Sequence, residues 1–351
     1  MKKYYSLYAT VRDKILRGEY RAGEKLPSKR VMSDMTGLSI VTVTTAYDML
    51  ADEGYVCSKE RSGYYVCGTE GFLRIGADKT YEPITYVSDD TDSVGTDFEY
   101  SVWFRTVRRV MAEGGEKLFV KAPSEGCAIL RNALADYLLR YRGMYASPSR
   151  IVIGSGAEQL YEIAVKLLGR DKIFGVEDPC YEQITEVYDG MGVEVRRLKM
   201  GSGGIESSAL RSESFDVLHV TPFHSYPSGV TATVAKRHEY LAWAKNTSGY
   251  IIEDDFDSEF FMPGQPIESL YSLDGGGSVI YINTFSKSLS PSMRMGYMIL
   301  PEELMEIYER RLSRFSCTVP VLEQYVLAEF ISGGSFERHL NRVRRRINHR
   351  K

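Results

Sequence analysis

Short apolar, β-rich runs alternate with amphipathic stretches over the second half of the chain, and this alternation limits the possible folds more than any other feature. Helical periodicity occurs at about 157–168, 180–190, 234–246 and 301–315. Such alternation favours a layered α/β fold with a largely parallel sheet, because parallel neighbours need a crossover connection. A ligand is then expected at the carboxyl ends of the strands. The β-rich runs are 151–153, 172–176, 194–198, 217–220, 250–253, 279–282 and 297–300.

The composition is that of a globular chain of about two domains, with 351 residues, 43% of them hydrophobic and 26% charged. No run approaches the roughly 20 apolar residues that span a bilayer. The N-terminus also lacks the apolar core of a signal peptide. Five scattered cysteines without a C-x-x-C pair argue against a disulfide framework or a zinc site. We therefore expect a cytoplasmic protein with no membrane partner and no metal.

The net charge of −3 is unevenly distributed along the chain. Residues 1–66 carry eleven basic and eight acidic side chains, whereas the last fifteen residues carry seven basic and one acidic. A basic first domain favours contact with a polyanion, although +3 on 66 residues is common in proteins that bind no DNA. Residues 68–99 lose all periodicity and are rich in acids, which indicates a linker. We expect domains at 1–67 and 100–351.

The first part of the chain has the pattern of three helices followed by a hairpin. An apolar face marks the first helix, Ser28 offers an N-cap for a short second helix, and Ser39 caps a third. Two β-rich runs, 55–58 and 64–66, flank a turn at Gly63. This order is typical of a winged helix-turn-helix, whose third helix enters the DNA major groove. Small three-helix modules that only bind proteins can show the same pattern.

Two short motifs follow strand ends in the second part of the chain. Gly154-Ser155-Gly156-Ala157 comes after one apolar run and opens a helix, where glycines and free backbone N–H groups favour a phosphate. Many strand-to-helix turns look alike, so this signal is weak by itself. Glu253-Asp254-Asp255 ends another run, and acids at such a position point into the ligand crevice or cap a helix.

Two further motifs concern a lysine and an aromatic ring. Lys287 follows a β-rich run, is surrounded by hydroxyl side chains and precedes Arg294 by seven residues. A lysine that forms a Schiff base needs a sheltered pocket, and hydroxyls with an arginine suit a phosphate ester. A lone lysine is otherwise a surface charge. Tyr181 comes soon after a strand end and would by itself be a packing residue.

The string LPSKRVMSDMTGLSIVTVTTAYDMLADEGYV, followed by SGYYV, resembles the GntR-type DNA-binding domain. The resemblance implies that Arg30 binds phosphate or base edges and that the start of the third helix reaches the groove. Ile40 and Thr44 stand where many members carry arginine, so few phosphate contacts and a modest salt dependence are expected. Lys29 and Lys59 could equally be solvated charges. The DNA-binding residues implied are Lys29, Arg30, Ser39, Val41, Thr42, Thr44, Lys59, Arg61 and Gly63.

The string TFSKSLSPSMRMGY, together with EDDFDSEF and TPFHSYPSG, resembles the fold-type-I pyridoxal-phosphate enzymes of the aspartate aminotransferase group. With the N-terminal domain, the closer resemblance is to the MocR/GabR-type subfamily of GntR transcription regulators. It implies a three-layer α/β domain, with Lys287 in a Schiff base with pyridoxal 5′-phosphate and Asp254 holding the pyridine nitrogen protonated. The cofactor-binding residues implied are Ser155, Gly156, Ala157, Tyr181, Asp254, Thr284, Lys287 and Arg294.

The chain departs from this subfamily in three places. Phe256 stands where a tyrosine usually binds the cofactor's 3′ oxygen, and Tyr226 is a candidate substitute. Glu158 replaces a common glutamine and adds a negative charge near the phosphate loop. The basic C-terminal helix ends where a small domain normally follows, so we expect that domain to be absent, whether by natural shortening or because the sequence stops early. The arginines at 342 and 344–346 are more simply a solvated helix face than a replacement substrate site.

The sequence therefore predicts a pyridoxal-phosphate-dependent transcription regulator that binds operator DNA as a homodimer and senses an amino acid, an amine or the cofactor itself. The first alternative is a genuine aminotransferase with an accessory DNA-binding domain, which would need a carboxylate clamp that the sequence does not show. The second is a DNA-binding module that has lost the cofactor, in view of Phe256 and Glu158.

Overall fold

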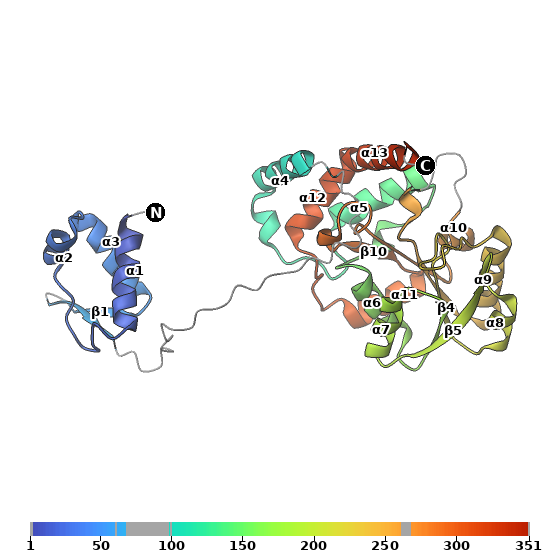
Figure 1. The fold of residues 1–351 in the computed structure, drawn as a ribbon, viewed down its shortest axis with the longest axis horizontal. Helices are drawn as coiled ribbons and strands as arrows, with labels where there is room; N and C mark the ends of the chain where they lie inside the picture. The colour runs from blue at the N-terminus through green and yellow to red at the C-terminus, as the bar shows by residue number, and fades with distance from the viewer. Residues whose placement is uncertain (1–2, 60–61, 68–97, 99, 261–267, 350–351) are drawn as a thin grey trace. The chain divides into compact units, whose positions relative to one another are not determined.

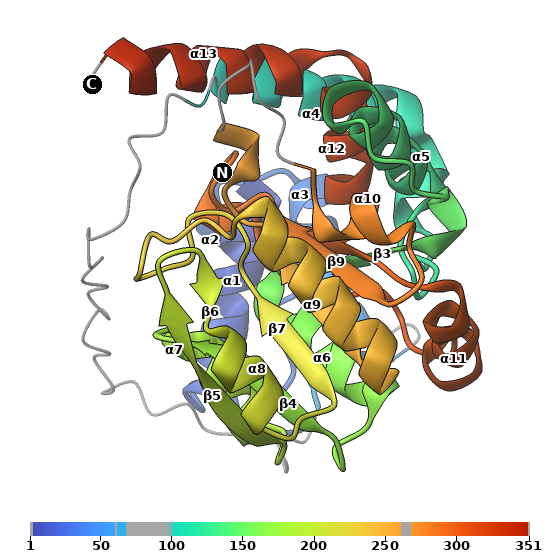
Figure 2. The same ribbon diagram turned by 90° about the vertical axis from the view of Figure 1, so that its right-hand side faces the viewer.

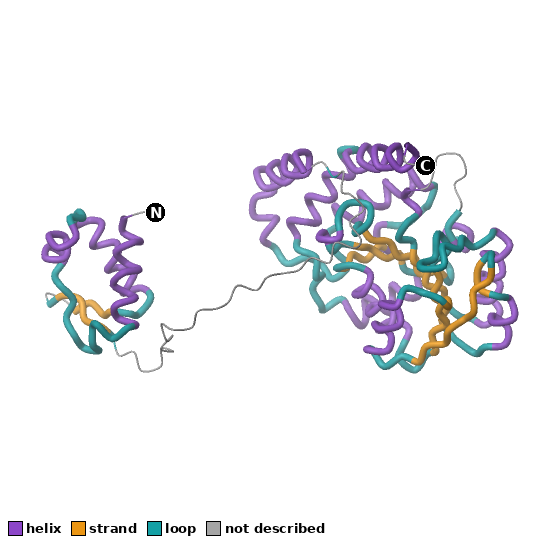
Figure 3. Tube along the Cα trace, viewed as in Figure 1, coloured by secondary structure: helices purple, strands orange, loops and turns teal. Residues whose placement is uncertain are grey.

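The computed structural model describes residues 3–59, 62–67, 98, 100–260 and 268–349. The chain divides into two compact units, Met1–Asp89 and Asp90–Lys351, and each is treated by itself below. Figure 1 shows the element labels used here, and Figure 3 shows the same trace by secondary structure. The predicted linker lies outside the described residues except for Phe98, whose buried ring packs against Trp103 and Phe330.

The first unit has three helices and a two-stranded antiparallel sheet, as the sequence predicts. Ser28 and Ser39 cap the second and third helices, and each side-chain oxygen accepts a hydrogen bond from a backbone N–H three residues on. Gly37 ends the second helix at a φ of +67°, a conformation that glycine adopts without strain. The elements are α1 (Lys3–Leu16), α2 (Lys29–Thr36), α3 (Ile40–Asp52), β1 (Val56–Lys59) and β2 (Gly63–Val66).

The core of this unit is almost wholly apolar and comes from one face of each long helix. Its residues on α1 and α3 recur three or four positions apart, which is the spacing of one helical face. The Tyr47 hydroxyl is satisfied by a hydrogen bond to the Pro27 carbonyl at 2.9 Å. The α-helical core residues are Leu7, Tyr8, Val11, Ile15, Met32, Val43, Ala46, Tyr47 and Leu50.

The second unit is built on one eight-stranded sheet of order β3-β10-β9-β8-β7-β4-β5-β6. The central run from β9 to β5 is parallel, while β10 pairs antiparallel with β3 and β9, and β6 antiparallel with β5. This confirms the expected α/β fold with a largely parallel sheet. The strands are β3 (Ile151–Gly154), β4 (Ile173–Asp178), β5 (Glu194–Gly201), β6 (Gly204–Ile205), β7 (Val217–Val220), β8 (Tyr250–Asp254), β9 (Val279–Thr284) and β10 (Gly296–Ile299).

Helices cover both faces of this sheet and make it the middle of three layers (Figure 2). One face packs against α6 (Ala157–Leu168), α7 (Glu182–Gly190) and α11 (Glu302–Leu312). Side chains alternate along each strand, so that Ile252 faces this layer and Ile251 faces the other. The helices on the other face are α5 (Ala128–Tyr137), α8 (Ser207–Ser212), α9 (Val234–Thr247), α10 (Leu270–Asp274), α12 (Val321–Ser332) and α13 (Ser335–His349).

Several helices of the second unit were not predicted from periodicity. The helix α4 (Tyr100–Gly114) packs on α12 rather than on the sheet. After α5 the chain forms one π-helical turn, Leu138–Arg142, which ends at Gly143 with a φ of +63°. Across the described ranges, no helix is both long enough and apolar enough to cross a membrane.

Candidate functional site

The residues predicted to bind a cofactor lie at one edge of the large sheet. The strands β3, β4, β8 and β9 all point the same way, so the loops after their carboxyl ends meet at this edge. Asp254 and Thr284 end β8 and β9, and Ser155 directly follows β3. The side-chain contacts divide the site into a loop around Gly156, a buried group of side chains around Asp254 and a partly exposed group around Lys287.

The loop between β3 and α6 has glycine at residue 156, in a backbone conformation that other residues rarely adopt. Its φ of +91° disfavours any side chain, and a Cβ atom there would lie 2.8 Å from a guanidinium nitrogen of Arg294. Gly156, the N-cap of α6, has no side chain to occupy the first backbone N–H groups of the helix, which suits an anion. The structure thus brings Gly156 close to Arg294, and both are residues predicted to bind the cofactor.

Two side chains that the sequence analysis did not single out organise this loop. Gln159 accepts hydrogen bonds from the backbone N–H and the hydroxyl of Ser155 at 2.6 and 3.1 Å. Thr318 donates either to Ser155 or to Gln159, at 3.1 and 2.7 Å. Gln159 and Thr318 therefore hold the Ser155 hydroxyl in place at the start of α6.

Glu158 forms an ion pair with Arg294, and both side chains are about half exposed. An exposed pair of this kind contributes only about 0–1 kcal/mol, so Arg294 can exchange it for an anionic ligand at little cost. The predicted negative charge beside the loop is thus compensated by a neighbouring arginine.

The three consecutive acids at the end of β8 have three different partners. Glu253 accepts hydrogen bonds from the backbone N–H groups of Leu270 and Tyr271, both at 2.9 Å, and so caps α10. Burial raises the pKa of Glu253 to about 7. Asp255 accepts from Arg142 at 2.8 Å and from the Tyr281 hydroxyl at 2.7 Å, in a buried ion pair. These two acids therefore stabilise the fold.

Asp254 is the acid that remains for a ligand. Its carboxylate is buried on the opposite side of β8 from Glu253 and Asp255, and one oxygen accepts a hydrogen bond from the Tyr161 hydroxyl. The Nε2 atom of His219 lies 3.9 Å from the same oxygen, and His219 Nδ1 lies 2.7 Å from the Tyr188 hydroxyl. The second oxygen, Oδ1, has no hydrogen-bond partner among the described residues. A buried carboxylate oxygen without a partner indicates a site for a cationic group.

Lys287 lies on the loop after β9 and is about one-third exposed. Its Nζ atom is 2.8 Å from the Asp257 carboxylate and 4.7 Å from the centre of the Phe256 ring. The other Asp257 oxygen is 3.0 Å from Nδ1 of His224. Phe256 thus contacts the lysine through its ring face, a cation–π arrangement that needs no hydroxyl.

Tyr181 and Tyr226 approach each other across the same edge. Their ring centres are 5.9 Å apart in an edge-to-face arrangement, and both side chains are exposed. Thr284 is buried at the end of β9. Several side chains that contact the predicted residues or one another were not found from the sequence, because their signal lies in spatial contacts. Only His219, a lone polar residue in an apolar strand, has a local signal. These residues are Gln159, Tyr161, Tyr188, His219, His224, Asp257 and Thr318.

These features fit pyridoxal 5′-phosphate. Its phosphate suits the Gly156 loop and Arg294, its ring nitrogen suits the unpartnered Asp254 oxygen, and its aldehyde suits Lys287. In the described ranges no cluster of His, Cys, Asp and Glu could hold a metal ion.

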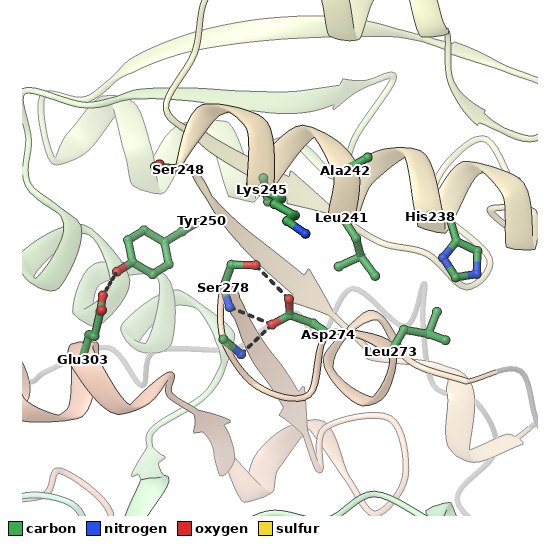
Figure 4. A pocket seen from close by; sticks show the side chains of 13 residues that line it. His238, Leu241, Ala242, Lys245, Ser248, Tyr250, Leu273, Asp274, Ser278 and Glu303 are labelled. Carbon is green, nitrogen blue, oxygen red and sulfur yellow. Dashed lines mark hydrogen bonds between the residues drawn. The ribbon is translucent and has the colours of Figure 1, made fainter.

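A surface pocket of about 660 Å³ lies away from these residues (Figure 4). It is lined by Tyr250 at the amino end of β8, by Ser278 just before β9, and by side chains of α9, α10 and α11, including Glu303. Asp274 in its wall accepts bonds from the backbone N–H groups of Gly277 and Ser278 at 2.7 Å. No predicted site residue lines it.

The candidate DNA interface of the first unit comprises α2, the start of α3 and the hairpin. Arg30 is exposed on the first turn of α2, and Lys29 lies over the Tyr64 ring at 5.1 Å. Lys59 lies 4.7 Å from the Tyr65 ring centre, and Gly63 in the hairpin has a φ of +118°. Arg61 lies outside the described residues. The exposed or half-exposed remainder of the predicted set on α3 and its cap is Ser39, Val41, Thr42 and Thr44.

Both units match known families. Residues 3–66 match the family of bacterial regulatory proteins of the GntR family, and residues 97–351 match the aminotransferase class I and II family. The chain is 32% identical over 97% of its length to the uncharacterized HTH-type transcriptional regulator YdeL of Bacillus subtilis, of which it covers 76%. It is 29% identical over 97% of its length to the probable rhizopine catabolism regulatory protein MocR of Rhizobium meliloti, covering 73% of it.

Solved structures of aminotransferases share the fold of the second unit. An archaeal alanine:glyoxylate aminotransferase has a TM-score of 0.63 at 23% identity, covering 69% of this chain and 62% of its own. LysN, an α-aminoadipate aminotransferase from Thermus thermophilus complexed with N-(5′-phosphopyridoxyl)-L-leucine, has a TM-score of 0.61 at 26% identity, with 71% and 64% covered. The chain thus spans slightly less than two thirds of each of these enzymes.

Fold and site together define a class of proteins in which a GntR-type DNA-binding domain is joined to an aminotransferase-like α/β domain. The chain belongs to the MocR-like subfamily of the GntR regulators.

Proposed function

We propose that this protein is a transcription regulator that binds operator DNA through residues 1–67 and holds pyridoxal 5′-phosphate in residues 100–351, connected by a linker at 68–99. The observation that carries the proposal is the buried, unpartnered Asp254 oxygen at the sheet edge that also carries Lys287, in a chain whose first unit is of the GntR type. Relatives bear regulator names, among them the pyridoxine biosynthesis regulator PdxR of Corynebacterium glutamicum, which is 29% identical.

The residues of the site suit the phosphate and the ring of the cofactor. The Gly156 loop, the start of α6, Thr284 and Arg294 would hold the phosphate. Tyr181 and Tyr226 would flank the ring at the exposed side of the site. When bound, the cofactor supplies an aldehyde that reacts reversibly with primary amines and an electron-poor ring.

The side chains around Asp254 leave one carboxylate oxygen for the ligand. Tyr161 donates its hydroxyl to one carboxylate oxygen, which leaves Oδ1 as the acceptor for a protonated ring nitrogen. His219, hydrogen-bonded to Tyr188, packs against the ring of Tyr161, whose hydroxyl binds this carboxylate. Asp257 holds Lys287 by an ion pair at the other side of the site.

An amino acid, an amine or the cofactor itself would act as the effector, because each changes what Lys287 and the Gly156 loop contact. An effector that makes different contacts in two conformations of a protein typically shifts the equilibrium between them by about 1–3 kcal/mol. We further propose a cytoplasmic homodimer, since two copies would match two operator half-sites.

A genuine aminotransferase is the second candidate, because Asp254 and Lys287 are both in place. Purified protein with cofactor, amino donors and a keto-acid acceptor would show turnover if the protein is an enzyme. The regulator proposal expects none beyond the rate of the cofactor alone.

The cofactor proposal is tested by visible absorbance of purified protein incubated with pyridoxal phosphate. Wild type is expected to acquire a protein-bound absorbance band that Lys287→Ala abolishes. The matched control Lys166→Ala, which removes an exposed lysine paired with Glu162 on α6, should keep the band. A wild type that stays colourless at saturating cofactor would refute both candidate functions and favour a regulator that has lost the cofactor.

The DNA proposal is tested by a mobility-shift assay on the intergenic DNA upstream of the gene. Wild type should bind at low salt, and Arg30→Ala should weaken binding about tenfold, as expected for an arginine whose interaction with DNA is worth about 1–3 kcal/mol. Absence of any shift at low salt would contradict the assignment.

A further inference from the structure

Four apolar side chains are exposed on the part of the first unit that would face DNA. Val41 is 76% exposed, Met35 68%, Val31 49% and Ile40 48%. Val31 and Met35 lie one turn apart on α2, and Ile40 and Val41 open α3, which packs against α2. These four residues are called the apolar edge below.

The four residues of the apolar edge lie outside the hydrophobic core of the first unit, whereas Met32 of the same helix α2 belongs to it. The inward face of α3 is already filled by Val43, Ala46, Tyr47 and Leu50, all of them completely buried. Valine and isoleucine are also poorer helix formers than alanine, so their exposed positions on the first turn of α3 add nothing to folding. Exposed apolar side chains that do not serve the fold point to a binding surface.

Four hydroxyl groups near the apolar edge, those of Thr36, Ser39, Thr42 and Thr45, form hydrogen bonds within the domain. Ser39 accepts from the Thr42 backbone at 3.2 Å, and its hydroxyl lies 2.9 Å from that of Thr42. Thr45 donates to the Val41 carbonyl at 3.0 Å, and Thr36 donates to the Met32 carbonyl at 2.6 Å. With these hydroxyls engaged, the most exposed side chains on the first turn of α3 are the apolar Ile40 and Val41.

Positive charges lie beside the apolar edge. Lys29 and Arg30 open α2, and the hairpin carries Lys59, which shares the Tyr65 ring with Lys25. Asp34 is the one acid on α2. Basic side chains beside an apolar centre complement DNA, whose phosphates border the grooves, better than they complement an apolar protein surface.

The C5-methyl group of thymine is an apolar group of DNA that the apolar edge could contact in the major groove. In the major groove, base pairs present donors and acceptors that differ by sequence, and the C5-methyl of thymine is the apolar feature among them. We propose that the apolar edge reads thymine methyl groups and that Val41 and Ile40 are its specificity-determining residues. This proposal rests on the proposed DNA-binding function and specifies the sequence class it selects.

The test uses duplexes selected by the full-length protein from a pool with a randomised central segment. The selected consensus should contain thymine at one or more positions, and replacing that thymine by uracil removes only the methyl group. Removal of one buried methyl group is expected to weaken binding about three- to fivefold. Uracil at positions outside the consensus serves as the control on the DNA.

A double-mutant cycle then assigns the thymine methyl to a residue. Val41→Ala should weaken binding to the thymine duplex to a similar extent and should abolish the discrimination between thymine and uracil, whereas Val41→Ile should retain it. The matched control Val234→Ala truncates a similarly exposed valine on α9 of the other unit and should change nothing. Ile40→Ala provides a second, independent variant, and circular dichroism checks that each variant is folded.

The outcomes separate this inference from the proposed function. Tight binding with no difference between thymine and uracil, or a consensus without thymine, would overturn the inference and leave DNA binding intact. Sensitivity to uracil that persists in both Val41→Ala and Ile40→Ala would also overturn it. Failure to bind any duplex at low salt would instead refute the DNA-binding function itself.

Discussion

The two units differ in how deeply their charged side chains are buried. Among the described residues of the first unit no charged side chain is buried, whereas the second unit buries Glu177, Glu253, Asp255 and Arg237 completely or nearly so. Burial ties the ionisation of a group to folding, while an exposed group acts on binding alone. Substitutions of charged residues should therefore change DNA affinity in the first unit, and stability and pH dependence in the second.

The largest effect is expected from the buried ion pair of the second unit. Arg142→Ala leaves the Asp255 carboxylate buried without its cation and should destabilise that unit by about 3–5 kcal/mol. Both tryptophans, Trp103 and Trp243, belong to this unit. Denaturant unfolding followed by tryptophan fluorescence therefore reports on it selectively.

A control for this substitution lies two residues away. Arg140 pairs with Asp136 at 3.7 Å, and both side chains are well exposed. Arg140→Ala should cost at most about 1 kcal/mol. Equal destabilisation by Arg142→Ala and Arg140→Ala would contradict the claim that burial decides how much a charged side chain contributes to stability.

A smaller effect concerns pH. Burial raises the pKa of Glu177 to about 8 and those of Glu253 and Glu259 to about 7. Because these values exceed the ordinary value of 4.5, the protonated groups favour folding at low pH, and this contribution is lost as the pH rises from about 4.5 through 7 to 8. The Tm of the second unit should fall accordingly over that window.

Glu177→Gln imitates the protonated acid and keeps an acceptor for the Ser225 hydroxyl, which lies 2.5 Å from the carboxylate. It should reduce the loss of stability between about pH 5 and 8 by on the order of 1–2 kcal/mol, as measured by thermal unfolding. Glu162→Gln, an exposed control on α6, should leave the pH profile unchanged. A steeper profile in Glu177→Gln would contradict the sign of this argument.

The smallest effect is expected in the first unit. Lys59→Gln and Lys29→Gln should each weaken DNA binding a few-fold and lower the slope of log K against log salt by about 0.9 for each phosphate that is no longer neutralised. Lys14→Gln on α1, another exposed lysine of that unit, is the control. Thermal stability should stay the same in all three variants. A large change in Tm would contradict the claim that charged residues of the first unit affect DNA binding and not stability.

Much of the fold could be predicted because its local signals are strong. Ser28 and Ser39 identify the starts of α2 and α3, and the apolar spacing of Val43 and Leu50 identifies the buried face of α3. The strands of the large sheet were visible as apolar runs because the sheet is covered on both faces. By contrast, α12 is apolar on nearly all sides and lacks the periodicity that reveals an amphipathic helix.

The site was harder to predict, because its contacts join residues far apart in the chain. Asp254 could be chosen among three adjacent acids only through the family resemblance; its hydrogen bond to Tyr161 crosses 93 residues and leaves no local pattern. The pairing of Lys287 with Asp257 likewise depends on how the loops after β8 and β9 meet. The roles of the predicted cofactor and DNA residues remain predictions for the experiments above.

The three acids that end β8 have a consequence for how this chain can vary. Since neighbouring strand residues face opposite sides, inserting or deleting one residue there would turn Asp254 toward α10 and its neighbours toward Tyr161. A single insertion or deletion would thus displace three things at once: the Asp254 carboxylate proposed to meet the ligand, the cap of α10 and the buried ion pair of Asp255. Point substitutions can alter these three functions separately, but insertions and deletions cannot, so the segment can change in composition more readily than in length.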